Sequence, residues 1–142
     1  MSKKIDISRI KVKFGDKHGP KDEKLIKLLK DAYQGKLLAY ITLVKIEGIK
    51  PFSDFKPQIS KEYRAYFENT EKENLPPPIY VYPEGEYLIM SDDYNKFYLY
   101  KEKNYSKIMC VLLGDSENRF IIEKSEPFVL PSPKAKVINP SD

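Results

Sequence analysis

The sequence predicts an α/β (α+β) domain, in which two to three helices pack on a small mixed sheet. Two observations favour this class. Several segments show helical periodicity, and short apolar segments rich in β-branched residues alternate with them. A third is the length, because 142 residues suffice for one domain with its own core. We therefore expect a single domain over residues 1–130, followed by a proline-rich tail over residues 131–142.

The first third of the chain is predicted to form a strand and then a helix. Apolar and polar residues alternate over residues 4–14 with one slip, which is typical of a strand. Over residues 20–34 apolar residues recur every three or four positions, which predicts an amphipathic helix ended by Gly35. Its opposite face carries lysines spaced three residues apart: Lys21, Lys24, Lys27 and Lys30. These lysines form either a solvated face or a phosphate-contacting one.

The next segments read as a strand, a loop and a short helix. Residues 37–46 are nearly all apolar or β-branched, as in a strand covered on both faces. Residues 50–59 contain two prolines and are expected to be an extended loop. Ser60 is a good capping residue for a helix over residues 60–69.

A hairpin and a second helix follow. Residues 79–82 and 86–90 are predicted strands, joined by a tight turn at residues 83–85. Residues 94–103 are predicted to form a helix, and either Asp92 or Asp93 could cap it. Two more strands are expected at 107–113 and 119–123. The tail that begins at Ser125 should be anchored by three apolar residues: Phe128, Val129 and Leu130.

Positive charge is concentrated near the start of the chain. Residues 1–36 hold eleven Lys and Arg against five Asp and Glu, a balance of +6, whereas the remaining residues come to −2. A basic first third suits contact with the phosphates of DNA or a nucleotide. The richness in Lys, Glu, Ile and Tyr is also typical of a thermophile.

The single cysteine and single histidine exclude several chemistries. Cys110 lies in an apolar strand and is expected to be a buried, inert thiol. His18 has no neighbouring ligand residue for a transition metal. Without disulfides, without an apolar leader at the start and without a long apolar run, the chain is expected to be cytoplasmic, with no membrane partner.

One stretch resembles a known family. Residues 76–115, PPPIYVYPEGEYLIMSDDYNKFYLYKEKNYSKIMCVLLGD, give a strand, a hairpin, a second strand, a turn, a helix and a third strand. Residues 44–52, VKIEGIKPF, lead from an apolar strand to a proline. This order is similar to the core of ParB-like and sulfiredoxin-like domains. The resemblance implies their fold and an association with DNA or nucleotides.

The family's own motif is largely replaced here. The His-Arg pair that begins the helix in ParB-like domains corresponds to Asn95 and Lys96, and the reactive cysteine of sulfiredoxins corresponds to Tyr94. Lys96 could hold a phosphate as a point charge, whereas Asn95 cannot act as a general base near neutral pH. The resemblance therefore implies a catalytically degenerate protein that needs no cofactor.

These residues support three hypotheses. The leading one is a ParB-like, DNA-associated or phosphate-contacting binding protein that uses Asn95, Lys96, Lys24 and Lys27. The alternative is a metal-dependent nuclease or nucleotide hydrolase, in which Asp92 and Asp93 hold Mg²⁺. Against it, neighbouring aspartates at a helix start usually act as a cap. The third is a protein-interaction module that uses exposed tyrosines and the proline-rich tail.

Overall fold

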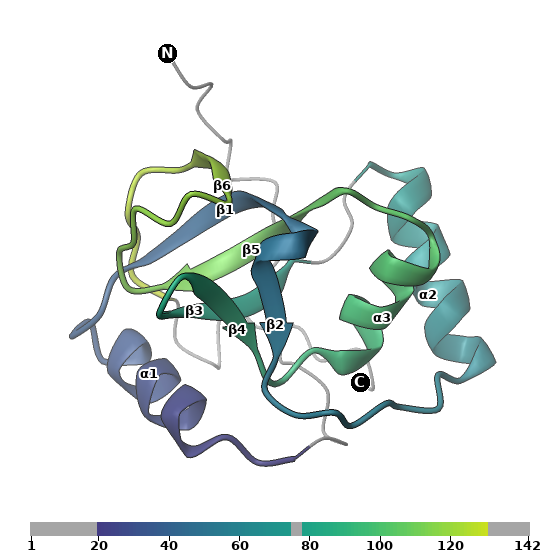
Figure 1. The fold of residues 1–142 in the computed structure, drawn as a ribbon, viewed down its shortest axis with the longest axis horizontal. Coiled ribbons are helices and arrows are strands. Elements are labelled where there is room, and N and C mark those ends of the chain that lie inside the picture. The colour runs from purple at the N-terminus through teal and green to yellow at the C-terminus, as the bar shows by residue number, and fades with distance from the viewer. Residues whose placement is uncertain (1–19, 75–77, 131–142) are drawn as a thin grey trace.

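The structure is a computed structural model that describes residues 20–74 and 78–130. The strand predicted over residues 4–14 and the tail over residues 131–142 lie outside the described residues. Within them the chain forms three α-helices, one short 3₁₀ helix and a six-stranded mixed sheet (Figure 1). The predicted fold class is therefore confirmed.

The sheet contains two antiparallel parts, which are joined at its centre by a parallel pair of strands. In chain order its strands are β1 (Ala39–Lys45), β2 (Ile49–Pro51), β3 (Ile79–Glu84), β4 (Tyr87–Met90), β5 (Lys107–Leu113) and β6 (Ile121–Lys124). Their order across the sheet is β2-β4-β3-β5-β1-β6. The β3–β5 and β2–β4 pairs are parallel, and the other pairs are antiparallel. Helix α3 connects β4 to β5, as a parallel neighbour of β3 requires.

Side-chain caps begin two of the three α-helices, and backbone hydrogen bonds close the ends of all three. They are α1 (Glu23–Tyr33), α2 (Lys61–Lys72) and α3 (Tyr94–Glu102), with the 3₁₀ helix η2 (Ile46–Gly48) after β1. The predicted cap Ser60 accepts a hydrogen bond from the N–H of Tyr63. Gly35, at φ +76°, ends α1, and the next N–H, that of Lys36, donates to the carbonyl of Asp31. This Schellman arrangement satisfies the last carbonyls of the helix.

Each face of the sheet has its own core. Helix α1 covers one face, where Leu25 and Ala32 pack with residues of β1, β3 and β5. Helices α2 and α3 lie together at the other side, where Phe67 and Phe97 pack against the opposite face (Figure 1). Burial on both faces explains why the predicted central strands are almost wholly apolar.

Three details differ from the prediction. Part of the expected loop at residues 50–59 belongs to β2, whose residue Ile49 pairs in parallel with Leu88. Pro51 is tolerated there because β2 is an edge strand. Strand β3 extends to Glu84, so the turn falls at residues 85–86. Val129 is exposed, while Leu130 is buried, because the alternation of an extended segment points only every second side chain inward.

Among the described residues, no helix combines the length and the apolar character needed to cross a bilayer.

Candidate functional site

The predicted bend between a strand and a helix exists at residues 91–93. Strand β4 ends at Met90 and α3 begins at Tyr94, with Asp93 at the N-cap position. Asp93 nevertheless makes no capping hydrogen bond with its side chain. Its Oδ2 accepts from the backbone N–H of Tyr80 at 2.8 Å, which turns the carboxylate toward the sheet. The bend therefore connects α3 to β3 through a buried carboxylate.

Lys96 is the partner of that carboxylate. Its Nζ lies 3.0 Å from Oδ1 of Asp93, and the side chains are 1% and 0% exposed. Among the described residues, neither atom has a further hydrogen-bond partner. Removing two charges from water costs several kcal/mol for each ion, so the pair is tolerated only because the charges compensate each other. The spacing of three residues in a helix brings them together.

The surroundings of this pair are aromatic and apolar. The rings of Tyr94, Phe97 and Tyr100 in α3 are all buried. Cys110 is also buried, as expected, and burial raises the pKa of its thiol, with a smaller contribution from the Asp93 carboxylate. A thiol in this environment is unreactive.

The chain that follows β2 covers the start of α3. The Oγ of Ser53 lies 2.9 Å from the hydroxyl of Tyr94, and the ring of Phe55 meets Tyr94 edge-on at 5.2 Å between centroids. Both contacts lie at the first helical residue. An anion approaching the N–H groups of this helix end would meet that segment and the carboxylate of Asp93.

The bend does not present the predicted phosphate and metal residues together. Lys96 is buried, so a phosphate contact would require its ion pair to open, and this role stays a prediction. Asn95 and Asp92 are half-buried, whereas Asp93 faces the interior. No group of three or more His, Cys, Asp or Glu side chains is placed to hold a metal ion in the described part of the chain. A Mg²⁺ site here would need Asp93 to leave Lys96.

One sequence signal could have revealed the pair. Positions 93, 96, 97 and 100 share one side of a helix, and two of them carry opposite charges while the other two are aromatic. Opposite charges three residues apart on an otherwise apolar side indicate a compensated buried pair. The helix is buried on more than one side, and of its residues Lys101 and Glu102 are exposed.

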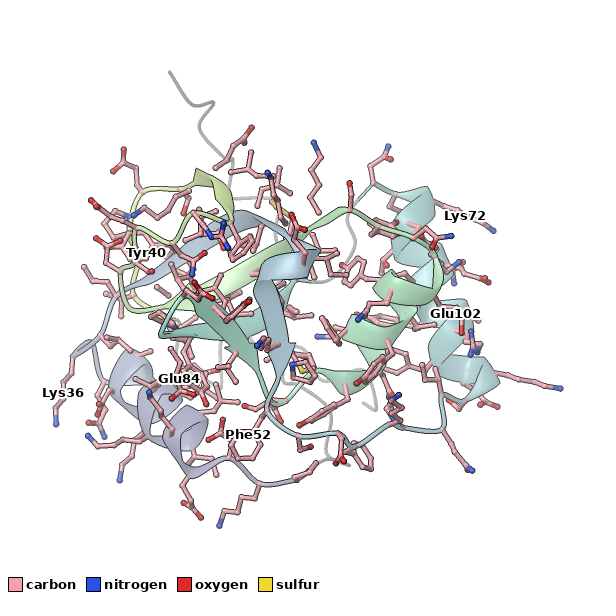
Figure 2. All side chains as sticks on the ribbon, in the orientation of Figure 1. Lys36, Tyr40, Phe52, Lys72, Glu84 and Glu102 are labelled. Carbon is pink, nitrogen blue, oxygen red and sulfur yellow. The ribbon has the colours of Figure 1, made fainter. Side chains whose placement is uncertain are left out.

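The lysines of α1 form a separate, solvent-facing group. Lys24 lies 3.2 Å from Glu84 and 5.0 Å from the centroid of the Tyr82 ring, and Glu84 is seen beside α1 in Figure 2. Lys27 pairs loosely with Asp31 at 3.8 Å. Because α1 and α3 cover opposite faces of the sheet, the structure does not bring the α1 lysines near Lys96.

Asp22 orients α1, a role that was not identified from the sequence. Its Oδ1 caps the helix by accepting from the N–H of Lys24 at 3.0 Å, and its Oδ2 accepts from the hydroxyl of Tyr82 at 2.7 Å. Burial, followed by this hydrogen bond, raises the pKa of Tyr82. One buried carboxylate thus joins α1 to β3 and turns the lysine face outward.

The described residues are close to neutral. They contain seventeen Lys and Arg against eighteen Asp and Glu, a balance of −1, whereas the whole chain is +4. Most of the difference comes from residues 1–19, with six Lys and Arg against two Asp and Glu. The excess of positive charge is therefore concentrated at the start of the chain, and α1 adds a balance of only +1.

The tyrosines give little support to an interaction surface. All eleven lie in the described residues, none is exposed, and four are buried: Tyr80, Tyr82, Tyr94 and Tyr100. Most of the rings therefore pack in the interior or at its margin. Large exposed side chains are scattered instead: Ile26, Leu38, Phe52, Ile122 and Val129.

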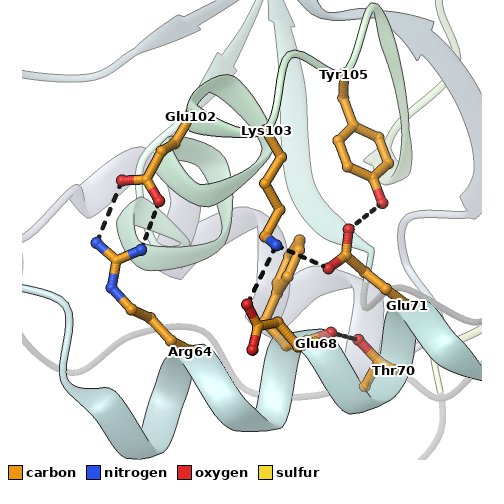
Figure 3. A network of polar contacts seen from close by, with 8 residues as sticks. Arg64, Glu68, Thr70, Glu71, Glu102, Lys103 and Tyr105 are labelled. Carbon is orange, nitrogen blue, oxygen red and sulfur yellow. Dashed lines mark hydrogen bonds and ion pairs between the residues drawn. The ribbon is translucent and has the colours of Figure 1, made fainter.

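A cleft that the sequence did not predict lies where α3 leads into β5. Its volume is about 510 Å³, and it is lined by Leu43, Tyr100, Lys103, Asn104, Tyr105, Ser106, Lys107, Ile108 and Met109. Beside it, polar contacts join α2 to α3, among them a bidentate Arg64–Glu102 pair (Figure 3). No sequence motif marks this cleft, because its lining comes from two strands and a helix end.

A scan against protein-family models found no match to this chain, and searches of curated proteins and of solved structures found none either. The structure is that of an α+β protein with a mixed six-stranded sheet. The bend before α3, at residues 91–93, is covered by the segment that follows β2. The similarity to ParB-like domains stays an expectation drawn from residues 44–52 and 76–115.

Proposed function

We propose that this chain is a DNA-associated binding protein without catalysis of its own, which contacts phosphates through the basic first third and the outer face of α1. The observation that carries the proposal is the position of four exposed lysines directly after the most basic stretch of the sequence: Lys21 just before α1, and Lys24, Lys27 and Lys30 on it. A basic stretch of sequence that leads into a lysine-bearing helix, beside a nearly neutral body, is the charge pattern of phosphate-backbone binding.

The local acids on α1 do not prevent this role. Lys21 and Lys27 pair with Glu23 and Asp31 in exposed contacts of 3.3 and 3.8 Å. Exposed pairs of this kind contribute little, so a lysine can exchange its carboxylate for a phosphate at small cost. Lys30 forms no ion pair within the described ranges.

The interior supports binding rather than catalysis. Lys96 and Asp93 neutralise each other away from solvent, and the Cys110 thiol is buried with a raised pKa. A general base or nucleophile must reach a substrate atom, and these three groups do not reach the surface. The mechanism we propose therefore consists of charge neutralisation and counterion release, with no bond made or broken.

A salt titration of DNA binding tests the proposal. Fluorescence anisotropy with a short labelled duplex should show binding that weakens as salt rises from about 50 to 200 mM. The double variant Lys27→Ala/Lys30→Ala should bind more weakly and reduce the slope of log K against log salt by about 1.8, since each lost phosphate contact accounts for about 0.9. Lys24 is left in place because it also contacts Glu84 and Tyr82.

The matched control removes the same charge from another helix. Lys61 and Lys72 are exposed on α2, so Lys61→Ala/Lys72→Ala changes net charge equally without touching α1. This control should keep nearly the wild-type affinity and slope. If both double variants weakened DNA binding equally, net charge alone would explain the effect and α1 would have no special role. If the wild type did not bind DNA at low salt, the proposed function would be rejected.

A further inference from the structure

We propose that the cleft between the end of α3 and the start of β5 binds a small organic phosphate that carries an apolar or aromatic group. The cleft combines a rigid wall, an apolar floor and a lysine at its edge, Lys107, which with its cross-strand neighbour Lys45 has no ion-pair partner in the described part of the chain. The site is separate from the α1 lysines, and the inference does not rest on the DNA-binding function.

The wall is held in place by the way α3 ends. Asn104 adopts a left-handed conformation at φ +61°, and its N–H donates to the carbonyl of Lys101 at 3.0 Å. The N–H of Tyr105 donates to the carbonyl of Tyr100, also at 3.0 Å. These are the two hydrogen bonds of a Schellman motif, here with asparagine in the place usually taken by glycine. Because the motif fixes the backbone, the cleft is preformed.

The floor comes from two strands. Leu43 of β1 and Met109 of β5 are directly paired across the antiparallel ladder, and both are only half-buried. Adjacent apolar side chains left partly open are the usual lining of a small-molecule site. A cleft volume of about 510 Å³ accommodates a ligand of nucleotide size.

The charge arises from the same strand register. Lys45 and Lys107 face each other at the end of the β1–β5 ladder, and both are exposed. Among the described residues neither has an ion-pair partner. Like charges directly opposite each other destabilise a sheet, and an anion bound between them removes that repulsion. Lys107 lines the cleft, so the anion would lie at this side of it.

The opposite side of the cleft is already neutralised. Figure 3 shows Lys103 between two carboxylates of α2, Glu68 at 3.4 Å and Glu71 at 3.2 Å. The Tyr105 hydroxyl donates to the other oxygen of Glu71 at 2.6 Å. These two carboxylates disfavour an anion beside α2. They therefore orient the ligand, with its phosphate toward Lys107 and its apolar group over Leu43 and Met109.

An amide chemical-shift titration of the full chain tests this site, with phenyl phosphate as the probe and inorganic phosphate and benzyl alcohol as its two halves. Phenyl phosphate should shift the amides of residues 103–109 and bind roughly tenfold more tightly than either half. Adenosine monophosphate forms a further arm. If adenosine monophosphate binds more tightly than phenyl phosphate, the natural ligand is assigned to the nucleotides. If it binds more weakly, the ligand is assigned to other aromatic phosphates.

Three variants make the result specific. Lys107→Gln should weaken phenyl phosphate several-fold and leave benzyl alcohol unchanged, whereas the control Lys61→Gln on α2 should change neither. Lys45→Glu should weaken phenyl phosphate and raise the Tm of the free protein, because it converts repulsion into a cross-strand ion pair. A merely structural role for Lys45 would not give these opposite effects.

Two outcomes would overturn the inference. One is phenyl phosphate binding no more tightly than inorganic phosphate, or shifting amides along α1 rather than around the cleft. The other is equal weakening by Lys61→Gln and Lys107→Gln, which would indicate non-specific attraction to surface lysines. Loss of binding in Lys27→Ala/Lys30→Ala would place the ligand on the DNA-contacting face instead.

Discussion

The two ends of α3 place similar charges in opposite environments. Near the first turn, Lys96 meets Asp93 with both side chains almost fully buried. Just after the last turn, Lys103 meets Glu68 and Glu71 at a water-exposed helix pair (Figure 3). All three contacts are between 3.0 and 3.4 Å long. Distance alone therefore does not distinguish the two ends.

Solvent makes the difference between them. Water screens and replaces the exposed contacts, so losing one of them costs little. Water does not solvate the buried lysine and carboxylate, so removing one partner leaves the other as an isolated charge in an apolar core. The start of α3 is therefore held by a buried ion pair, whereas the ion pairs at its end contribute little, and there the backbone turn at Asn104 fixes the wall of the open cleft.

The largest expected effect follows from isolating one buried charge. Lys96→Met leaves the Asp93 carboxylate uncompensated and should lower the free energy of unfolding by about 3–5 kcal/mol. Urea denaturation followed by fluorescence or circular dichroism measures it. The double variant Asp93→Asn/Lys96→Met should recover most of the loss, because the amide can still accept from the Tyr80 N–H. A single-variant loss below about 1 kcal/mol would mean that water reaches the pair.

A smaller effect is expected at the turn that ends α3. Asn104→Val places a β-branched side chain at φ +61° and should cost about 1–2 kcal/mol. Asn104→Gly is the control and should leave stability nearly unchanged, since glycine adopts this conformation freely. Thermal melts of both variants measure the difference. Equal Tm values for the two would show that the turn is not left-handed in solution.

The hydroxyl of Tyr105 provides a test at the same end of the helix. Tyr105→Phe removes its bond to Glu71 and should cost about 1 kcal/mol. Partial burial, with the Glu71 hydrogen bond second, raises the pKa of Tyr105 to about 12 from the ordinary 10.0. Its contribution to stability is therefore complete below pH 10 and declines as the pH rises toward 12.

Ultraviolet absorbance isolates this titration as the difference between the wild type and Tyr105→Phe. In Glu71→Gln the Tyr105 pKa should fall, because the carboxylate no longer disfavours the phenolate. A Tyr105 that titrates near 10 in the wild type would contradict the hydrogen bond.

The smallest effect is expected for the solvent-exposed ion pair that joins α2 to α3. Arg64→Ala removes the bidentate contact with Glu102, yet both side chains face solvent. The loss in stability should be several-fold smaller than for Lys96→Met and should vanish at about 0.5 M NaCl, where screening is strong. Chemical denaturation at low and high salt checks this. A loss that persists at high salt would mean that the contact is more buried than the exposed fractions of its two side chains, 41% and 53%, indicate.

Much of the fold could be predicted because local chemistry is strong in this chain. Two caps or stops were identified from residue type alone: Ser60 caps α2, and Gly35 ends α1. The strand at residues 107–113 was also predicted with its observed ends. Edge strand β2 was missed because three residues with a proline carry almost no strand signal of their own.

The candidate sites were less predictable for a different reason. Asp92 and Asp93 are adjacent and chemically identical, yet only Asp93 turns inward, because β3 presents the Tyr80 N–H to it. The facing of Lys45 and Lys107 depends on a register between strands more than sixty residues apart. No local pattern encodes that register, so the cleft and its charge could not be found.

The sequence by itself determined the kind and approximate place of most helices and strands, which of their sides are apolar, and that positive charge collects in the first third. Only the tertiary structure decided which charges meet: Asp93 with Lys96 in the core, and Lys45 opposite Lys107 at the surface. Periodicity and capping act within one element through neighbours three or four residues away. Burial and electrostatic pairing depend instead on which other element packs against it, and that is fixed only when the whole core forms.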